Sequence, residues 1–420
     1  MIVLSKYLDV LRINEAWKFS ISGLIMRMPM AMIGIATILS VKAAYGNYTL
    51  AGAVGAANIL ATCACAPLLA RLVDEYGQRR VMFPSLLASA AATLTLAVAI
   101  VYHAPAWLLF AASMIAGATW GSPGALVRSR WARVADRADQ LGTAYALEAA
   151  FDEFAFIVGP ILATVLGTML HPVTGLLVAV ACFLVGSTIF FAQRATEPVP
   201  RPRSASEKRR SVLANPVVLV LMATYIGAGA LFGANDVAVV EFAQEQGAAS
   251  ASGILLAIFS FGSCAAALAY GSRNWRSPIW KLFAAGVLAL AVGVSTFLFA
   301  HSLVMLAVVM LITGAACAPT MTNVNTIVTR VFAPVQLTEG LTWTTTALNV
   351  GVSLGSAVGG RLVDAAGSHG GFMVEVGAAW LMVAFMLVGL PLLRRKTGAT
   401  DIGSQTIYRD EDTSQFTAVS

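Results

Sequence analysis

The sequence predicts an all-α membrane protein with twelve transmembrane helices in two six-helix halves and with both termini in the cytoplasm. Three observations predict this fold class. First, 58% of the 420 residues are hydrophobic and only 11% are charged, a composition that excludes an ordinary soluble domain. Second, apolar stretches long enough to cross a bilayer recur along the chain. Third, the basic residues are divided unequally between the two sides of these stretches.

Each predicted span is an apolar stretch of roughly 20 residues, the length that an α-helix needs to cross about 30 Å of hydrocarbon. Short polar breaks separate neighbouring spans, and the mean hydropathy of the chain is +0.78. The expected limits are residues 19–41, 48–70, 81–102, 105–127, 141–168, 173–193, 216–240, 250–271, 280–300, 302–326, 340–363 and 371–393.

The basic residues predict the orientation of the spans. Apart from Arg27, Lys42 and Arg361, the Lys and Arg residues lie in segments on the side of the N-terminus. Such an excess is typical of cytoplasmic loops and predicts a multi-pass protein of the cytoplasmic membrane with an even number of spans. The net charge of +6 does not indicate nucleic-acid binding, because no basic face interleaved with aromatic residues accompanies it.

One proline-rich and basic segment, residues 194–215, predicts how the chain is divided. It is expected to be a cytoplasmic linker between an N-terminal half, residues 1–193, and a C-terminal half, residues 216–396. The polar tail, residues 397–420, is expected to be a disordered cytoplasmic segment. Residues 1–16 alternate apolar and charged positions and are expected to form an amphipathic helix at the membrane surface.

The two halves show signs of an internal repeat. A single offset aligns Pro123 with Pro319 and Gly159 with Gly355 without a gap, and it pairs Glu153 with Asn349. In addition, the tetrapeptide Arg-Leu-Val-Asp ends spans 2 and 11, at residues 71–74 and 361–364. The predicted orientation places these two copies on opposite sides of the membrane, as inverted three-helix units would.

Charged residues inside the spans are the strongest functional signal, because an ionised side chain at mid-bilayer costs roughly 2.5–3.5 kcal/mol. Span 1 contains Arg27, and span 5 contains Glu148, Asp152 and Glu153. These counts predict one buried cation against three buried acids. At least one acid is therefore expected to be protonated, as proton coupling would require.

Helical geometry and the repeat rank the three acids. Glu148 and Asp152 share one stripe of their helix, whereas Glu153 points away from it. Glu153 and Asn349 are expected to line a central cavity, together with Glu148, while Asp152 is expected in a helix contact. The alternative for Glu153 is a structural salt bridge with Arg27, whose own partner is either an acid or a substrate anion.

Other polar and aromatic positions carry weaker predictions. Trp120 could stack on a substrate in the cavity or simply pack against a neighbouring helix. Asp236 and Glu375 lie near the outer ends of spans 7 and 12, where water is expected to solvate them. The Cys and His residues have no metal-ligand spacing, so no catalytic residue, metal or cofactor is expected, and the chain is not expected to be an enzyme.

Two glycine patterns indicate helix packing. Gly351, Gly355 and Gly359 recur at every fourth residue and give span 11 a smooth face for close contact with another helix. Gly159 is followed by Pro160 in the middle of span 5.

The segment that includes Asp74, Gly77, Arg79 and Arg80, between spans 2 and 3, resembles the signature loop of the major facilitator superfamily. Gln78 stands where that family usually has a basic residue. The resemblance implies a conformational latch on the cytoplasmic side, with Asp74 and the basic residues as its charged members and the start of span 11 as its neighbour.

The resemblance extends to nearly the whole chain. Gly159-Pro160 resembles the core of a motif common in proton-exchanging exporters, although Ser113 stands where many proton-coupled members have arginine. The family resemblance therefore implies a secondary active transporter that moves a small solute by alternating access and is driven by protons. Export is the expected direction, for a monomer, and the alternative is an importer, either a proton symporter or a facilitator. A receptor or an enzyme without transport is the remaining alternative.

Overall fold

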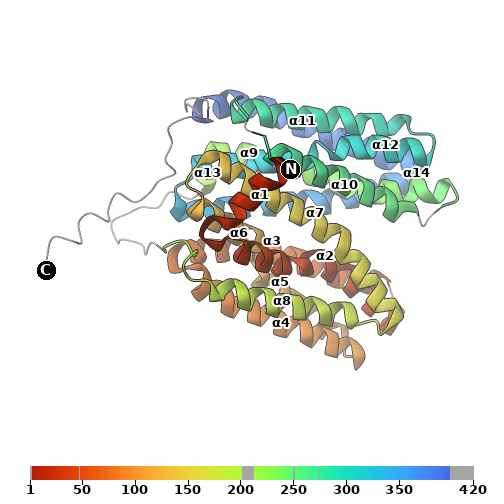
Figure 1. Ribbon diagram of the computed structural model, residues 1–420. Helices are drawn as coiled ribbons and strands as arrows, with labels where there is room; N and C mark the ends of the chain where they lie inside the picture. Colours follow the sequence, from red (N-terminus) through yellow and green to blue (C-terminus); the bar gives the residue numbers. More distant parts are fainter. Residues whose placement is uncertain (1, 47, 201–211, 249–250, 274, 398–420) are drawn as a thin grey trace, which may run out of the picture.

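The computed structural model describes residues 2–46, 48–200, 212–248, 251–273 and 275–397 (Figure 1). The middle of the predicted linker and all but the first residue of the predicted tail lie outside these ranges. Every regular element of the described residues is helical. The predicted fold class, an all-helical protein with twelve spans, is confirmed.

The N-terminal half contains one short helix and the first six spans. Its helices are α1 (Ile2–Arg12), α2 (Trp17–Tyr45), α3 (Tyr48–Tyr76), α4 (Gln78–Val101), α5 (Ala106–Trp120), α6 (Pro123–Val134), α7 (Ala138–Met169) and α8 (Thr174–Ala192). Spans 1, 2, 3, 5 and 6 are single helices. Span 4 is interrupted between α5 and α6 at Gly121, whose φ of 67° belongs to the left-handed region that favours glycine.

The C-terminal half contains the last six spans. Its helices are α9 (Pro216–Glu245), α10 (Ala251–Gly271), α11 (Ile279–Ser295), α12 (Leu303–Gly314), α13 (Cys317–Val331) and α14 (Leu337–Thr397). Helices α12 and α13 together form span 10. The 61 residues of α14 contain both spans 11 and 12, which are separated by non-helical backbone at Ala366 and Gly367.

The break in α14 is capped by a carboxylate. Gly367 has a φ of 64°, and the helix restarts immediately after it. Glu245, at the end of α9, accepts a hydrogen bond of 2.8 Å from the backbone N–H of Ser368 and a second one from the Ser368 hydroxyl. A carboxylate at this position satisfies a free N–H group of the new helix and matches the positive end of its dipole.

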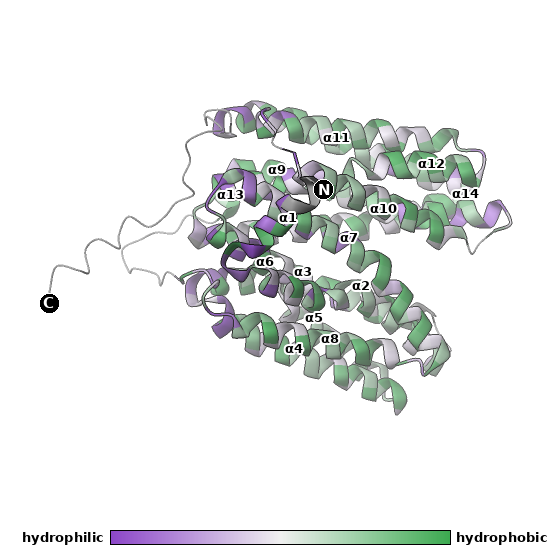
Figure 2. Ribbon diagram, in the orientation of Figure 1, coloured by the Kyte–Doolittle hydropathy of each residue, from purple (hydrophilic) through white to green (hydrophobic). Residues whose placement is uncertain are grey.

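The bundle has two ends, called the near end and the far end, each defined by the elements that lie there. At the near end, the end of α3 meets the start of α14, and α1 contacts the end of α10; this end is on the left in Figure 1. At the far end, α2 passes into α3 and α9 passes into α10. Figure 2 shows that hydrophilic residues gather at the near end, whereas hydrophobic residues cover the helices between the ends.

Exposed apolar side chains identify the surface that faces lipid. Leu60 of α3 is 67% exposed, and Val388 of α14 is 82% exposed. A soluble protein would not expose many such side chains to water along whole helices. In a bilayer, these side chains contact acyl chains instead of water. The chain is therefore a multi-pass membrane protein.

The predicted glycine stripe of span 11 packs against α9. A methyl group at Gly351 or Gly355 would collide with a carbonyl oxygen of α9, and one at Gly359 would lie 3.1 Å from the Cα atom of Ala234. In the other half, a methyl group at Gly159 would lie 2.8 Å from the Cβ atom of Ala31 in α2. Gly159 and Gly355 thus occupy equivalent positions in the two halves, as the sequence offset indicates.

Substitution of Gly355 by alanine tests this close packing. Gly355→Ala places a Cβ atom against the backbone carbonyl of Ala230, which cannot move without shifting the helix. We expect a loss of about 1–3 kcal/mol in the free energy of unfolding, the usual cost of overpacking. The matched control is Gly360→Ala, five residues further along the same helix, where nothing lies within 4 Å of the added atom. Equal unfolding midpoints for the two variants in detergent micelles would contradict the packing role.

The two halves meet at the near end. Thr143 of α7 donates a hydrogen bond of 2.6 Å to the carbonyl of Gly271 in α10, and the Tyr145 and Thr329 hydroxyls lie 2.8 Å apart. The Tyr7 hydroxyl of α1 donates to the Leu268 carbonyl at 2.6 Å. Toward the far end the helices of the two halves diverge (Figure 1). In the described residues, the hydrogen bonds between halves lie near this end or at mid-height, so the near end is closed.

Candidate functional site

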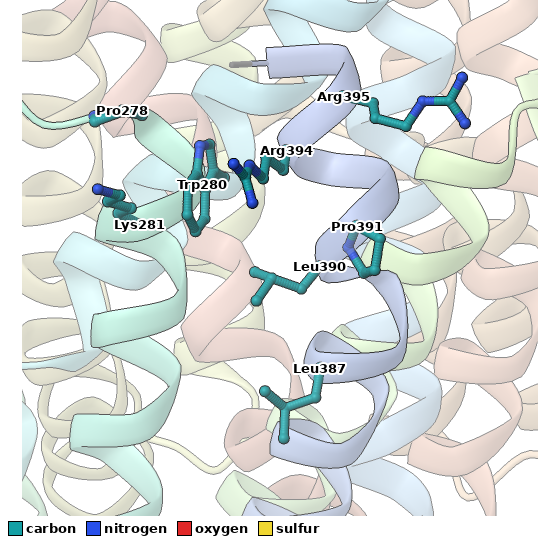
Figure 3. A pocket seen from close by; sticks show the side chains of 8 residues that line it. All are labelled: Pro278, Trp280, Lys281, Leu387, Leu390, Pro391, Arg394 and Arg395. Atoms are coloured by element: carbon teal, nitrogen blue, oxygen red, sulfur yellow. The ribbon is translucent and has the colours of Figure 1, made fainter.

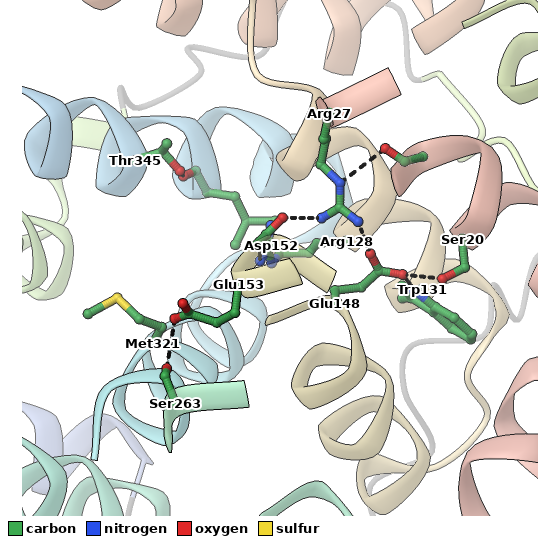
Figure 4. A network of polar contacts seen from close by, with 12 residues as sticks. Ser20, Arg27, Arg128, Trp131, Glu148, Asp152, Glu153, Ser263, Met321 and Thr345 are labelled. Atoms are coloured by element: carbon green, nitrogen blue, oxygen red, sulfur yellow. Dashed lines mark hydrogen bonds and ion pairs between the residues drawn. The ribbon is translucent and has the colours of Figure 1, made fainter. Parts of the chain in front are cut away.

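A buried network of charges joins three helices of the N-terminal half (Figure 4). Arg27 of α2 is its centre, with a side chain that is 1% exposed. One guanidinium nitrogen lies 2.7 Å from the Asp152 carboxylate of α7, and another binds the Glu148 carboxylate. The Arg27 Nε atom donates to the Gly23 carbonyl at 3.1 Å. Arg27 therefore has an acid partner rather than a free face for a substrate anion.

Glu148 is held entirely by protein donors. In addition to Arg27, its carboxylate accepts a hydrogen bond of 2.5 Å from the Ser20 hydroxyl and one of 2.7 Å from the Trp131 indole. The side chain is fully buried. The three donors, one of them the cationic guanidinium of Arg27, occupy the lone pairs of this buried carboxylate. The expectation that Glu148 lines an open cavity is therefore wrong.

Asp152 lies between two arginines. Its second carboxylate oxygen is 2.6 Å from a guanidinium nitrogen of Arg128 in α6, and the Asp152 side chain is 22% exposed. The break at Gly121 starts α6, and this helix brings Arg128 back against α7. The prediction of one buried cation against three acids is thus wrong. Two arginines, Arg27 and Arg128, bind two of the three acids in the middle of α7.

Glu153 stands apart from this network. Its carboxylate accepts a hydrogen bond of 2.7 Å from the Ser263 hydroxyl of α10, in the other half, and lies 4.0 Å from the Cys317 sulfur. The Ser263 hydroxyl in turn accepts from the backbone N–H of Ala318 at 3.1 Å. Within the described residues, Glu153 has no ion pair, so the alternative salt bridge with Arg27 is not present. Glu153 is a carboxyl group that bridges the two halves with neutral donors only.

At the near end, another acid bridges the halves. Asp74, at the end of α3, accepts hydrogen bonds from the backbone N–H groups of Thr338 at 3.3 Å and Glu339 at 3.0 Å. These residues form the first turn of α14, where free N–H groups and the helix dipole attract a negative charge. The structure thus places Asp74 against the start of span 11, the neighbour that the resemblance implied.

Comparisons with known proteins agree with this geometry. The sequence matches the Major Facilitator Superfamily over residues 19–242 and 221–407. The chain belongs to the major facilitator superfamily. A search of curated proteins finds no significant match.

Solved structures show that this superfamily member shares its fold with several transporters. The human organic anion transporter MFSD10 has a TM-score of 0.64 and 16% identity, over 92% of this chain and 98% of its own. The E. coli fucose:proton symporter FucP has a TM-score of 0.71 and 13% identity, over 90% and 98%. A bacterial homologue of the iron transporter ferroportin, in an outward-facing state, has a TM-score of 0.70 and 11% identity, over 89% and 98%.

The basic residues of the signature loop lie elsewhere than the resemblance implied. The side chains of Arg79 and Arg80 are exposed and form no ion pair within the described part of this superfamily member. The backbone N–H of Arg79 donates to Glu197 at 2.8 Å. Gly77 allows the turn before α4, since its φ is 97°.

Arg130 of α6 is the basic residue that organises this end of the N-terminal half. Its guanidinium donates to the Gln78 side chain at 2.9 Å and to the carbonyl of Phe190 at 3.0 Å. The side chain is fully buried, and this burial lowers the pKa of Arg130 to about 10, so it stays charged at neutral pH. Arg130 is not among the predicted site residues, because a basic residue next to a span gives no sign in the sequence of being buried.

The two remaining cavity candidates lie in different surroundings. Trp120 stacks on Phe183 of α8, with ring centroids 4.5 Å apart, and belongs to the core of the N-terminal half. The structure therefore supports packing for Trp120 rather than contact with a substrate. Asn349 is half-buried on α14, at the position equivalent to Glu153.

The two outer acids differ in exposure. Asp236 of α9 is exposed, whereas Glu375 of α14 is fully buried. Neither carboxylate oxygen of Glu375 has a hydrogen-bond partner. The prediction that water solvates Glu375 is wrong, because neighbouring helices cover its side chain.

A pocket lies at the near end, away from the charged network (Figure 3). Trp280 of α11 stands there between Lys281 and Arg394, whose charged groups lie 5.4 and 6.0 Å from its ring centroid. Leu387 and Leu390 of α14 form its apolar side. Basic and tryptophan side chains of this kind are typical of helix ends at a membrane surface.

Proposed function

We propose that this superfamily member is a proton-coupled exporter that exchanges protons for a small cationic solute across the cytoplasmic membrane. Membership of the superfamily establishes a membrane transporter of small molecules. The coupling to protons, the direction and the charge of the solute are the proposal. No cofactor is required, since the proton gradient supplies the driving force.

Glu153 is the observation that carries this proposal. Its carboxylate lies at mid-height of α7 and contacts Ser263 across the boundary between the halves. Its hydrogen-bond partners are neutral, so an ionised carboxylate there lacks a compensating charge within the described residues. A proton or a cationic solute group can supply that charge.

The charge balance of the site favours exchange. Arg27 and Arg128 balance two of the three acids in the middle of α7, Glu148 and Asp152, which leaves one negative charge at Glu153. A single carboxylate binds either a proton or a cationic group, and binding of one displaces the other. Such competition at one site is the simplest physical basis for antiport.

The conformation fits an exporter that has released its solute. The near end is closed by Asp74 and by the contacts around Thr143, and the positive-inside pattern assigns this end to the cytoplasm. The open end then faces outward, where Glu153 exchanges solute for a proton. The Gly159-Pro160 pair, which resembles an exporter motif, supports the same direction. Proton-driven import is the second candidate, favoured by the structural likeness to the fucose:proton symporter.

Proteoliposomes with an imposed pH gradient and an internal pH-sensitive dye test the coupling. A panel of small organic cations is added one at a time, and a transported cation should dissipate the gradient. We expect Glu153→Gln to lose at least nine tenths of this proton flux, because glutamine resembles the protonated acid and cannot release a proton. The direction is checked by comparing growth of overexpressing and deletion strains in the same cations, since an exporter protects and an importer sensitises.

Asp364→Asn is the matched control for Glu153→Gln. Asp364 is an exposed acid at the end of span 11, so its loss should leave proton flux unchanged. Equal flux in wild type and Glu153→Gln would overturn the assignment of Glu153. Anions and sugars are then added in the same assay. If some of these but no cation dissipate the gradient, the proposed solute class is overturned.

A further inference from the structure

Glu375 is a second buried acid, and it lies in the half that the Arg27 network does not reach. Its side chain is fully buried in α14, and neither carboxylate oxygen has a hydrogen-bond partner in the described residues. By contrast, the buried Glu148 has three donors. An ionised carboxylate without donors is highly unfavourable in a helix bundle, so a neutral, protonated Glu375 fits this environment.

The packing register places Glu375 beside Asn235 of α9. A methyl group at Gly371 would lie 2.6 Å from the Cβ atom of Ala238, and one at Gly227 would lie 2.9 Å from that of Met382. Because the two helices run in opposite directions, these contacts set Glu375 level with residues 234 and 235. Ala238 and Asn235 share one face of α9, since they are three residues apart.

Asn235 supplies an independent sign of a missing partner. Its side chain is 4% exposed, yet its Oδ1 atom accepts no hydrogen bond. A buried amide oxygen without a donor is rare in folded proteins. A protonated Glu375 has one O–H group to donate, which is what this oxygen lacks.

Among the residues that the structure describes, Glu375 has no cationic partner. Asp236, on α9, is the acidic group that interacts electrostatically with Glu375. Helix α11 also packs against α14, and its ionisable residue, Lys281, lies at the other end of the bundle. The adjoining segment Thr296–Phe299 has no ionisable side chain. A second negative charge next to Asp236 would be repelled, whereas a proton on Glu375 removes that repulsion.

We propose that Glu375 is a proton-binding site of the C-terminal half, protonated in this conformation and donating its O–H group to the Oδ1 atom of Asn235. It extends the proposed proton coupling, because it gives the transporter a second site besides Glu153. Asp236, which follows Asn235 in the sequence, has an exposed side chain.

Infrared spectroscopy of the purified full-length protein in lipid vesicles tests this site without any solute. A protonated carboxyl group has its own C=O stretching band, which moves on exchange into heavy water. At neutral pH, the wild-type spectrum minus that of Glu375→Gln should contain one such band. Asp364→Asn is the control, because Asp364 is an exposed acid away from the site, and its spectrum should retain the band. A difference spectrum without a protonated carboxyl band would overturn the proposal.

A second variant tests the hydrogen bond. Asn235→Leu removes the acceptor, and the band should move to higher frequency because a free carboxyl group has a stiffer C=O bond. An unchanged frequency would overturn Asn235 as the partner. Glutamine mimics protonated Glu375, so Glu375→Gln should keep the wild-type unfolding midpoint at neutral pH; a large loss would mean that the native site is ionised. The proton-flux assay on Glu153 can fail while the infrared band persists, so the two proposals are separable.

Discussion

Replacement of Arg27 by alanine is expected to reduce the free energy of unfolding by about 3–5 kcal/mol, the cost of removing one member of a buried ion pair. The reason is the environment of Glu148. This carboxylate is fully buried, and without Arg27 it retains only the neutral donors Ser20 and Trp131. Unfolding in mixed micelles, followed by tryptophan fluorescence against denaturing detergent, measures the loss.

Arg128→Ala is the matched control, because Arg128 also binds an acid of α7. Its partner Asp152 is 22% exposed and keeps Arg27, so we expect a loss of about 1–2 kcal/mol. Adding Glu148→Gln to Arg27→Ala should recover part of the larger loss, since it removes the uncompensated charge. Equal losses for the two arginine variants would contradict the central position of Arg27.

Replacement of Asp74 by asparagine is expected to shift the conformational equilibrium about tenfold toward an open near end. Asp74 accepts two backbone N–H groups from the first turn of α14 and brings a negative charge to its dipole. Asparagine retains one acceptor but no charge, and loss of a capping charge costs roughly 1–2 kcal/mol. A difference of about 1.4 kcal/mol corresponds to a factor of ten in the population. Distances between spin labels on α3 and α14 at the near end measure the shift.

The sequence provides its own control in the second copy of the tetrapeptide. Asp364→Asn makes the same chemical change in an exposed residue near the far end. We expect the spin-label distances of this variant to match those of wild type. A similar shift in both variants would show that Asp74 has no special part in closing the near end.

The twelve spans were predictable because they depend on hydrophobicity and length, which each segment displays by itself. The breaks within spans were harder to predict. Gly121 divides span 4 by adopting a positive φ, and a glycine in an apolar run gives no sign of this until its neighbours are known. The same break explains why Arg128 was not predicted as a second buried cation. Arg128 follows it and turns back into the bundle, although the sequence placed it in a loop.

The site was predictable where charge inside a span was the signal. Glu148 and Asp152 lie on one side of α7 and Glu153 on another, as their helical spacing indicates, whereas the binding of Glu148 to Arg27 was not predicted. Contacts between side chains and backbone groups were harder to predict. Asp74 binds backbone N–H groups of α14 rather than the arginines of its own loop. A sequence pattern identifies charged side chains directly, but it does not show which helix end lies next to them. Burial of Glu375 depends on packing between distant segments, which no local pattern reports.

The two capped helix starts of α14 have different fates during transport. Glu245 and Ser368 belong to the same half, so their contact can persist while the halves rock. Asp74 and Thr338 belong to opposite halves, so their contact must break each time the near end opens. The strength of the contact between Asp74 and α14 therefore has both a lower and an upper limit. A contact that is too weak leaves the near end leaky to protons, and one that is too strong makes its rupture the slowest step of the cycle.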